Sequence, residues 1–228
     1  MKKSNVLVPS TRRSFFGSLG KGLTAIGAFS QILYPGKVSA SANSTEPLSE
    51  VEEWFKKIKG SHRIVYDAPS IHEGFPIIWS WVFLDASHSS GSTDEDLTSM
   101  VVFRHNAFAL ALNDDIWSSF KLGKFLKISD PLTGVPAATN PYWDPPQGVM
   151  ADAGMSIKKL LERGAMFCVC ERSLSVNSRM VAKARNLDAD AVKKEWVDGL
   201  LPGVQIVPAG VWAINRAQEL GCSYCFAG

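Results

Sequence analysis

Five short apolar runs recur along the chain, and longer segments with helical periodicity separate them. Each run is four to six residues long, which suits a buried strand. The runs are residues 63–66, 100–103, 165–170, 204–207 and 223–226. Buried strands that alternate with helices are typical of a mostly parallel sheet covered on both faces. The pattern therefore predicts an α/β fold, a three-layer α/β/α sandwich with a five-stranded, mostly parallel sheet.

The intervals between these runs carry apolar residues at helical spacing. The predicted helices cover residues 49–59, 75–87, 107–126, 156–163, 176–186, 189–196 and 210–220. The second of them is apolar on nearly every side between Pro76 and Leu84, whereas a surface helix has one polar face. Such a helix is either fully buried or in contact with another subunit. We expect the second, and therefore a homo-oligomer.

Residues 129–150 contain five prolines and lack a clear helical or strand pattern. Loops of this length are uncommon in compact domains unless they are functional or disordered. We interpret the segment as a proline-rich insertion in the domain. Asn140, which precedes Pro141, Tyr142 and Trp143, is a candidate ligand-binding residue in a lid over the site. The alternative is that this part of the insertion packs on a neighbouring subunit.

The first 42 residues have the pattern of a twin-arginine signal peptide. Arg12 and Arg13 precede two phenylalanines and a weakly apolar stretch, residues 15–33, that Lys21 interrupts. Small residues follow at 38–42, as a signal peptidase requires. We predict export to the periplasm or elsewhere outside the cytoplasm, with removal of residues 1–42; the alternative is an N-terminal anchor or a basic arm. Residues 43–60 would then form an extension and a helix, and residues 61–228 the domain.

Charge is unevenly placed along the chain, which has 24 Lys and Arg and 22 Asp and Glu. Six of the basic residues and none of the acidic residues lie within positions 1–42. The rest of the chain therefore has 18 basic and 22 acidic residues and a formal charge of −4. We expect no nucleic-acid partner, because phosphate binding needs a basic face. We also expect no membrane span once the signal is removed.

All four cysteines lie in the last third of the chain. Cys170 ends the third apolar run, and open α/β sheets bind ligands at the carboxyl ends of their strands. The amides of a following helix would favour its thiolate; the alternative is a buried structural thiol. Cys168 and Cys170 face the same way on the predicted strand and are poorly placed to bond to each other. A site of four thiolates is less favoured, because the cysteine spacing is not that of a zinc ribbon, and we predict no metal.

Polar residues near the second run complete the candidate site. His105 could act as a base or a ligand. The alternative is that His105 only caps a turn. Arg104 could hold an anion or pair with Asp114 or Asp130. Asn113 and Asp114 lie in a predicted helix that is otherwise apolar, so we expect them to face inward and bind a ligand. Motifs for phosphate loops, serine nucleophiles and zinc helices are missing, and the sequence names no cofactor.

Four segments, taken in their order and spacing, carry a resemblance to a known family. They are residues 101–114, 160–170, 202–211 and 217–224. Together they resemble the DsrE-like family of small α/β proteins, over nearly the whole chain from about residue 62. An exported, largely uncharacterised branch is the most similar, and it shares Arg104-His105, Asn113-Asp114-Ile116-Trp117 and residues 130–134.

This resemblance implies a persulfide-carrying cysteine at the end of the third strand, a place that Cys170 occupies, and assembly as a trimer or hexamer. It also implies that the last strand runs against its neighbours, so that Cys222 would approach Cys170. A Cys170–Cys222 disulfide is then an option in an oxidising cell envelope. Two functions remain open. The first is cysteine chemistry, either binding and transfer of small sulfur species or thiol redox. The second is a non-catalytic module that binds a ligand or forms an assembly.

Overall fold

The computed structural model describes residues 48–146, 148–150 and 154–228. These residues belong to one compact unit, Thr45–Gly228. The predicted signal peptide, residues 1–42, and residues 43–47 of the predicted extension lie outside the described part of the chain. None of the described helices is both long enough and apolar enough to cross a membrane.

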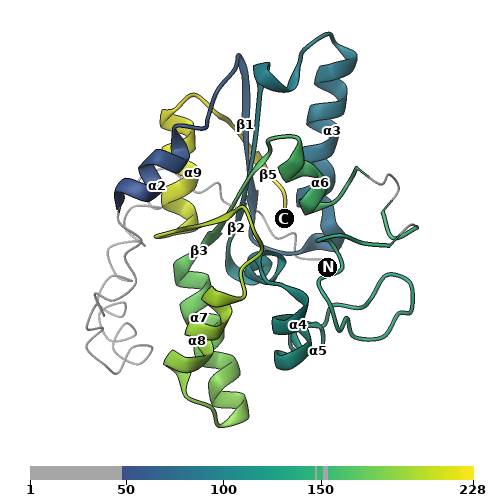
Figure 1. Cartoon of the computed structure of the whole chain (residues 1–228), viewed down its shortest axis with the longest axis vertical. Helices are drawn as coiled ribbons and strands as arrows, with labels where there is room; N and C mark the ends of the chain where they lie inside the picture. Colours follow the sequence, from purple (N-terminus) through teal and green to yellow (C-terminus); the bar gives the residue numbers. More distant parts are fainter. Residues whose placement is uncertain (1–47, 147, 151–153) are drawn as a thin grey trace, which may run out of the picture. The chain divides into compact units, whose positions relative to one another are not determined.

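Five strands form one sheet in the spatial order β4-β3-β2-β1-β5, and every neighbouring pair is parallel. They coincide with the five apolar runs of the sequence. Helices cover both faces of the sheet, so the predicted α/β fold is confirmed (Figure 1). The strands are β1 (His62–Ala68), β2 (Leu97–Phe103), β3 (Met166–Cys170), β4 (Val204–Val207) and β5 (Ser223–Phe226).

The direction of β5 differs from the expectation. β5 runs parallel to β1, with Tyr224 beside Val65, so the predicted antiparallel closing strand is wrong. Helix α9 (Gly210–Glu219) connects β4 to β5. A helix between two strands of one sheet carries the chain back to the starting end, which makes the strands parallel. Cys222, just before β5, therefore lies at the opposite end of the sheet from Cys170, the last residue of β3.

Two separate apolar clusters hold the layers together. On one face, α2 and α9 pack over Val65, Met100 and Cys168. On the other face, a larger cluster joins the sheet to α3, α6, α7 and α8, and Figure 1 shows α9 and α3 on opposite sides of the sheet. The remaining elements are α2 (Leu48–Phe55), η1 (His72–Gly74), α3 (Phe75–Ser89), η2 (Asp94–Asp96), α6 (Ile157–Glu162), α7 (Glu171–Arg185) and α8 (Ala189–Asp198).

The predicted long helix over residues 107–126 is three elements: η3 (His105–Ala111), α4 (Asp114–Phe120) and α5 (Leu122–Leu126). Asn113 begins α4, because its Oδ1 accepts a hydrogen bond from the Ile116 amide at 3.0 Å. Lys121, with a φ of 49°, separates α4 from α5. The prediction of one helix was wrong because Asn113 caps a helix rather than sitting inside one.

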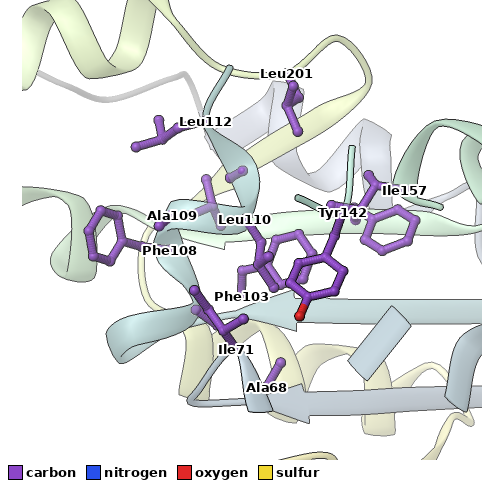
Figure 2. Packing of buried hydrophobic residues seen from close by; sticks show 14 of the residues in the cluster. Ala68, Ile71, Phe103, Phe108, Ala109, Leu110, Leu112, Tyr142, Ile157 and Leu201 are labelled. Carbon is purple, nitrogen blue, oxygen red and sulfur yellow. The ribbon is translucent and has the colours of Figure 1, made fainter. Parts of the chain in front are cut away.

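The described part of the proline-rich insertion packs on the larger core. Asn140 anchors it, since its Nδ2 donates to the carbonyl oxygens of Leu110 at 3.0 Å and Leu112 at 2.9 Å. Gly123 allows a second close contact, because a Cβ at this position would lie 2.2 Å from the Ala137 carbonyl oxygen. Further along, Tyr142 is buried among the core side chains shown in Figure 2. The described part of the insertion thus covers one side of the larger apolar core.

Helix α3 is buried on only part of its surface in the single chain. Ile77 and Leu84 are buried, and Ser80 forms a 2.7 Å hydrogen bond with Ser99 of β2 through their hydroxyls. Trp79 and Val82, however, are 38% and 39% exposed. Full burial of this helix within one chain is therefore ruled out, and contact with another subunit stays a prediction.

Candidate functional site

A buried carboxylate near the carboxyl end of β1 connects this strand to β2 and β5, on the face that α9 covers. Asp67 of β1 is 4% exposed. Its Oδ1 accepts a hydrogen bond from Arg104 Nε at 2.5 Å, and its Oδ2 accepts from Arg104 Nη2 at 2.9 Å and from the Tyr224 hydroxyl at 3.0 Å. A buried charge is costly without such partners. Asp67 thereby fixes the residue that follows β2 and a side chain of β5.

Arg104 extends this arrangement toward Cys170. Its hydrogen bonds with Asp67 raise the pKa of Arg104; burial opposes this effect, while the nearby Tyr224 and Cys170 add to it. Nε and Nη2 bind Asp67, whereas Nη1 has no hydrogen-bond partner among the described residues. Arg104 is therefore a fixed cation with unused donors close to a thiol. We call Asp67, Arg104, Cys170 and Tyr224 the thiol site.

Cys170 is 6% exposed, and the first residue of α9 lies close to both Cys170 and Arg104. A Cβ on Gly210, the first residue of α9, would lie 2.8 Å from the Arg104 Cβ and 3.4 Å from the Cys170 Cβ. Only glycine therefore lets the start of α9 approach both side chains this closely. Cys170 is also the N-cap residue of α7. The amino ends of two helices thus meet at this cysteine.

The surroundings of Cys170 favour negative charge. The amino end of a helix carries unpaired amides and a partial positive charge, and the guanidinium of Arg104 adds a full one. The thiolate is the nucleophilic form of cysteine. Partial and full positive charges therefore lie beside the sulfur of Cys170.

The other cysteines lie in different surroundings. Burial, followed by the neighbouring Cys170, raises the pKa of Cys168 well above its ordinary value, so this thiol stays protonated. Burial also raises the pKa of Cys222, and Arg63 opposes the effect. All four cysteines are free. The Cys170–Cys222 disulfide was a wrong expectation, because a parallel β5 places the two residues at opposite ends of the sheet.

A four-thiolate metal site, the less favoured reading of the cysteines, is likewise contradicted. Within residues 48–146, 148–150 and 154–228, no three or more His, Cys, Asp or Glu side chains gather in a metal-binding arrangement. The cysteines themselves are divided between β3 and the opposite edge of the sheet at β5. The four cysteines therefore do not come together at one site.

His105 follows Arg104 but faces different partners. Its backbone has a φ of 48°, its amide donates to Ser173 Oγ at 2.6 Å, and its carbonyl accepts from Asn177 Nδ2 at 3.5 Å. The residue is exposed, and no described hydrogen bond joins its imidazole to Cys170. Its backbone anchors the segment to α7, and a catalytic role for the imidazole stays a prediction.

Asn113, Asp114 and Asn140 form a second group, which lies at the insertion. Asn113 caps α4, and Asp114 Oδ1 accepts a hydrogen bond from the Asn140 amide at 2.8 Å. Asn140 Oδ1 accepts from the Tyr142 amide at 3.1 Å, in addition to the two bonds that its Nδ2 donates. These polar atoms hold the insertion against the residues before α4. Their predicted ligand-binding role has no support in this arrangement, which uses the same atoms for internal bonds.

Sequence reasoning brought Arg104 and Cys170 into one site but missed Asp67, Tyr224 and Gly210. Asp67 carried a signal, since a carboxylate at the end of an apolar strand, just before Ala68 and Pro69, is an expensive residue to bury. Tyr224 gave none, because its partner is known only once β5 is placed beside β1. Gly210 gave a weak signal, as a glycine at the start of a predicted helix.

Comparisons with known proteins identify no family for the chain. No family model matches it, and no curated protein gives a significant match. Among solved structures, the chain is similar to a protein of unknown function from Methanobacterium thermoautotrophicum, with 18% sequence identity and a TM-score of 0.38. The alignment covers 73% of this chain and 99% of that one. The function must therefore be argued from the site itself.

Proposed function

We propose that this chain binds and transfers sulfane sulfur through the thiol of Cys170. The observation that carries the proposal is the position of Cys170 at the end of β3, with the Arg104 side chain and the start of α9 packed beside it. This combination favours an anionic sulfur. Redox chemistry through an internal disulfide is less well supported, because Cys168 faces the same way on the strand and Cys222 lies at the other end of the sheet.

The proposed step is a nucleophilic displacement on an inorganic polysulfide. The thiolate of Cys170 attacks a terminal sulfur, and one sulfur–sulfur bond of the polysulfide breaks. The shortened polysulfide leaves with the electron pair of that bond, and Cys170 keeps one sulfur atom as a persulfide anion. The reverse displacement by another thiolate passes that sulfur on. The low exposure of Cys170 suits a small inorganic donor better than a protein disulfide.

The cellular setting belongs to the same proposal. The arginine pair and apolar stretch of residues 1–42 support export by the twin-arginine route. The four segments that resemble the DsrE-like family support a sulfur role for Cys170. Trp79 and Val82, exposed on α3, support assembly with further copies of the chain.

A matched pair of cysteine variants tests the sulfur role. Cys170 and Cys222 are both 6% exposed but lie at opposite ends of the sheet. After incubation with polysulfide and removal of the excess, the wild type and Cys222→Ser are expected to gain one sulfur atom by intact mass and to release it to cyanide. Cys170→Ser is expected to gain none. Equal loading of Cys170→Ser and wild type, with both proteins folded by circular dichroism, rejects the proposal.

A further inference from the structure

A pocket of about 530 Å³ lies between the start of α3 and the described part of the insertion. Its size is within the range of small-molecule sites, which are mostly apolar with a few polar groups. We call it the insertion pocket. Its apolar walls come from Ile71, Ile78, Ile128, Met150 and Met155.

Tyr142 supplies an unpartnered polar group to this pocket. The residue is 6% exposed, and its ring packs so closely on Gly74 that a Cβ there would come within 2.4 Å of Tyr142 Cε1. Its hydroxyl has no hydrogen-bond partner among the described residues, although its backbone amide and carbonyl are both bonded. Figure 2 shows the ring among apolar side chains, with this oxygen at its far end.

The tyrosine hydroxyl is a neutral donor under physiological conditions. Burial, and then the nearby carboxylate of Glu73, raise the pKa of Tyr142 to about 12. A hydroxyl that faces a pocket can donate a hydrogen bond to a ligand bound there. The polar side chains that line the pocket are those of Tyr142, Glu73, Lys127 and Ser129, and its other lining residues are apolar.

The polar rim of the pocket selects against a charged ligand. Glu73 and Lys127 both line it, and neither has an ion-pair partner in the described part of the chain. Their opposite charges leave the rim without net charge. Both residues hold left-handed backbone, with φ values of 52° and 58°.

We propose that the insertion pocket binds a small neutral aromatic ligand that carries a hydroxyl group, such as a phenol. The ligand hydroxyl accepts a hydrogen bond from Tyr142 and donates one to the Glu73 carboxylate. A hydroxyl group has both the donor and the acceptor that this arrangement needs. The aromatic ring lies on the apolar wall, where the sulfur atoms of Met150 and Met155 favour aromatic contacts.

This site is independent of the sulfur proposal. Tyr142 and Ile71 belong to the core cluster on the α3 face of the sheet, whereas Cys170 contacts the start of α9 on the other face. The polysulfide experiment and a ligand-binding experiment can therefore fail separately. Cys170→Ser is expected to bind an aromatic ligand as the wild type does.

Calorimetry on the full chain with 2-naphthol and naphthalene tests the proposal. The wild type is expected to bind 2-naphthol more tightly than naphthalene by about tenfold or more, as the two proposed hydrogen bonds predict. Tyr142→Phe removes one of the two proposed hydrogen bonds and leaves the one to Glu73, so its preference for 2-naphthol should fall clearly below that of the wild type. Ile78→Trp fills the pocket from α3 and should abolish binding of both probes. Val176→Trp, an exposed change on α7 outside the pocket, is the control and should bind as the wild type does.

Each alternative result has a definite meaning. Failure of the wild type to bind 2-naphthol overturns the proposal. So does an unchanged preference in Tyr142→Phe, or unchanged binding in a folded Ile78→Trp, because the probe would then sit elsewhere.

Discussion

Asp67 and Arg104 illustrate how a single buried carboxylate constrains the residues around it. Asp67 is 4% exposed and uses both oxygens, whereas the Arg104 side chain is 28% exposed and reaches solvent. Removing the guanidinium would leave a buried negative charge with the Tyr224 hydroxyl as its remaining side-chain partner. Breaking a buried pair on one side is more damaging than replacing both members.

We therefore expect Arg104→Met to lower the free energy of unfolding by about 2 kcal/mol. This loss is smaller than the loss from breaking a fully buried ion pair, because Arg104 is partly exposed. Urea unfolding measures this loss. The double variant Asp67→Asn, Arg104→Met should recover part of the stability, since it removes the unpaired charge. Polysulfide loading of Cys170 should fall in both variants, because the cation beside the thiol is gone. A single variant as stable as the wild type would show that Asp67 does not depend on Arg104.

At the residue scale, the sequence predicted the part of the site that strand ends define. Arg104 follows one apolar run, and Cys170 is the last residue of another. Parallel strands bring the residues at their carboxyl ends to one end of a sheet. Tyr224 could not be predicted, because its contact with Asp67 depends on the direction and register of β5. Asn140 was misread for a related reason. Its side chain is saturated by backbone groups of a segment about thirty positions earlier, which no local pattern reveals.

Helices α7 and α8 are joined by a carboxylate at the first turn of α7. Glu171 Oε1 accepts hydrogen bonds from Ser175 Oγ at 2.7 Å and from Lys193 Nζ of α8. Burial alone would raise the pKa of Glu171, but these two hydrogen bonds and the charge of Lys193 outweigh it, and the pKa is lowered. The folded state therefore favours the ionised form.

This shift predicts an acid-dependent loss of stability. A carboxylate whose pKa is lower in the folded state stabilises the protein fully at pH values above its unfolded-state pKa of 4.5. This stabilisation is lost as the pH falls through the folded-state pKa. Glu171→Gln should cost about 1 kcal/mol at neutral pH, as a partly exposed ion pair does. The difference from the wild type should shrink below about pH 4.5 in unfolding curves at several pH values. Glu195→Gln, an exposed change on α8, is the control, and a constant difference for Glu171→Gln would contradict the linkage.

At the element scale, the five strands were predicted from their apolar runs, because buried parallel strands leave that signature. The direction of β5 could have been derived as well. The predicted helix over residues 210–220 separates two runs and implies a parallel return, yet the family resemblance implied the reverse. The break at Asn113 was harder to foresee, because the residues on both sides are apolar and suit a helix. An asparagine with Asp114 and Asp115 behind it is, in hindsight, a helix start.

At the scale of the whole molecule, helix α3 contributes exposed apolar side chains to one surface. Trp79, Val82 and Phe83 of α3 line a shallow groove of about 440 Å³ together with Tyr66 and Cys225. The groove runs beside β5, an edge strand that pairs only with β1. Unpaired edges and exposed apolar groups favour association with another chain. A second copy of this chain suits the surface, because an edge strand can pair with its own equivalent across a symmetry axis.

We expect the protein to form a homo-oligomer through this α3 and β5 surface, and Val82→Glu should shift it toward the monomer. A buried, unpaired carboxylate at the interface would cost several kcal/mol, which is enough to dissociate a complex at micromolar concentration. Val176→Glu is a matched control, because Val176 is also an exposed helical valine, 54% exposed on α7 and away from the groove. Sedimentation velocity at several concentrations separates the species. A monomeric wild type, or equal dissociation by both variants, would assign the apolar surface of α3 to something other than self-association.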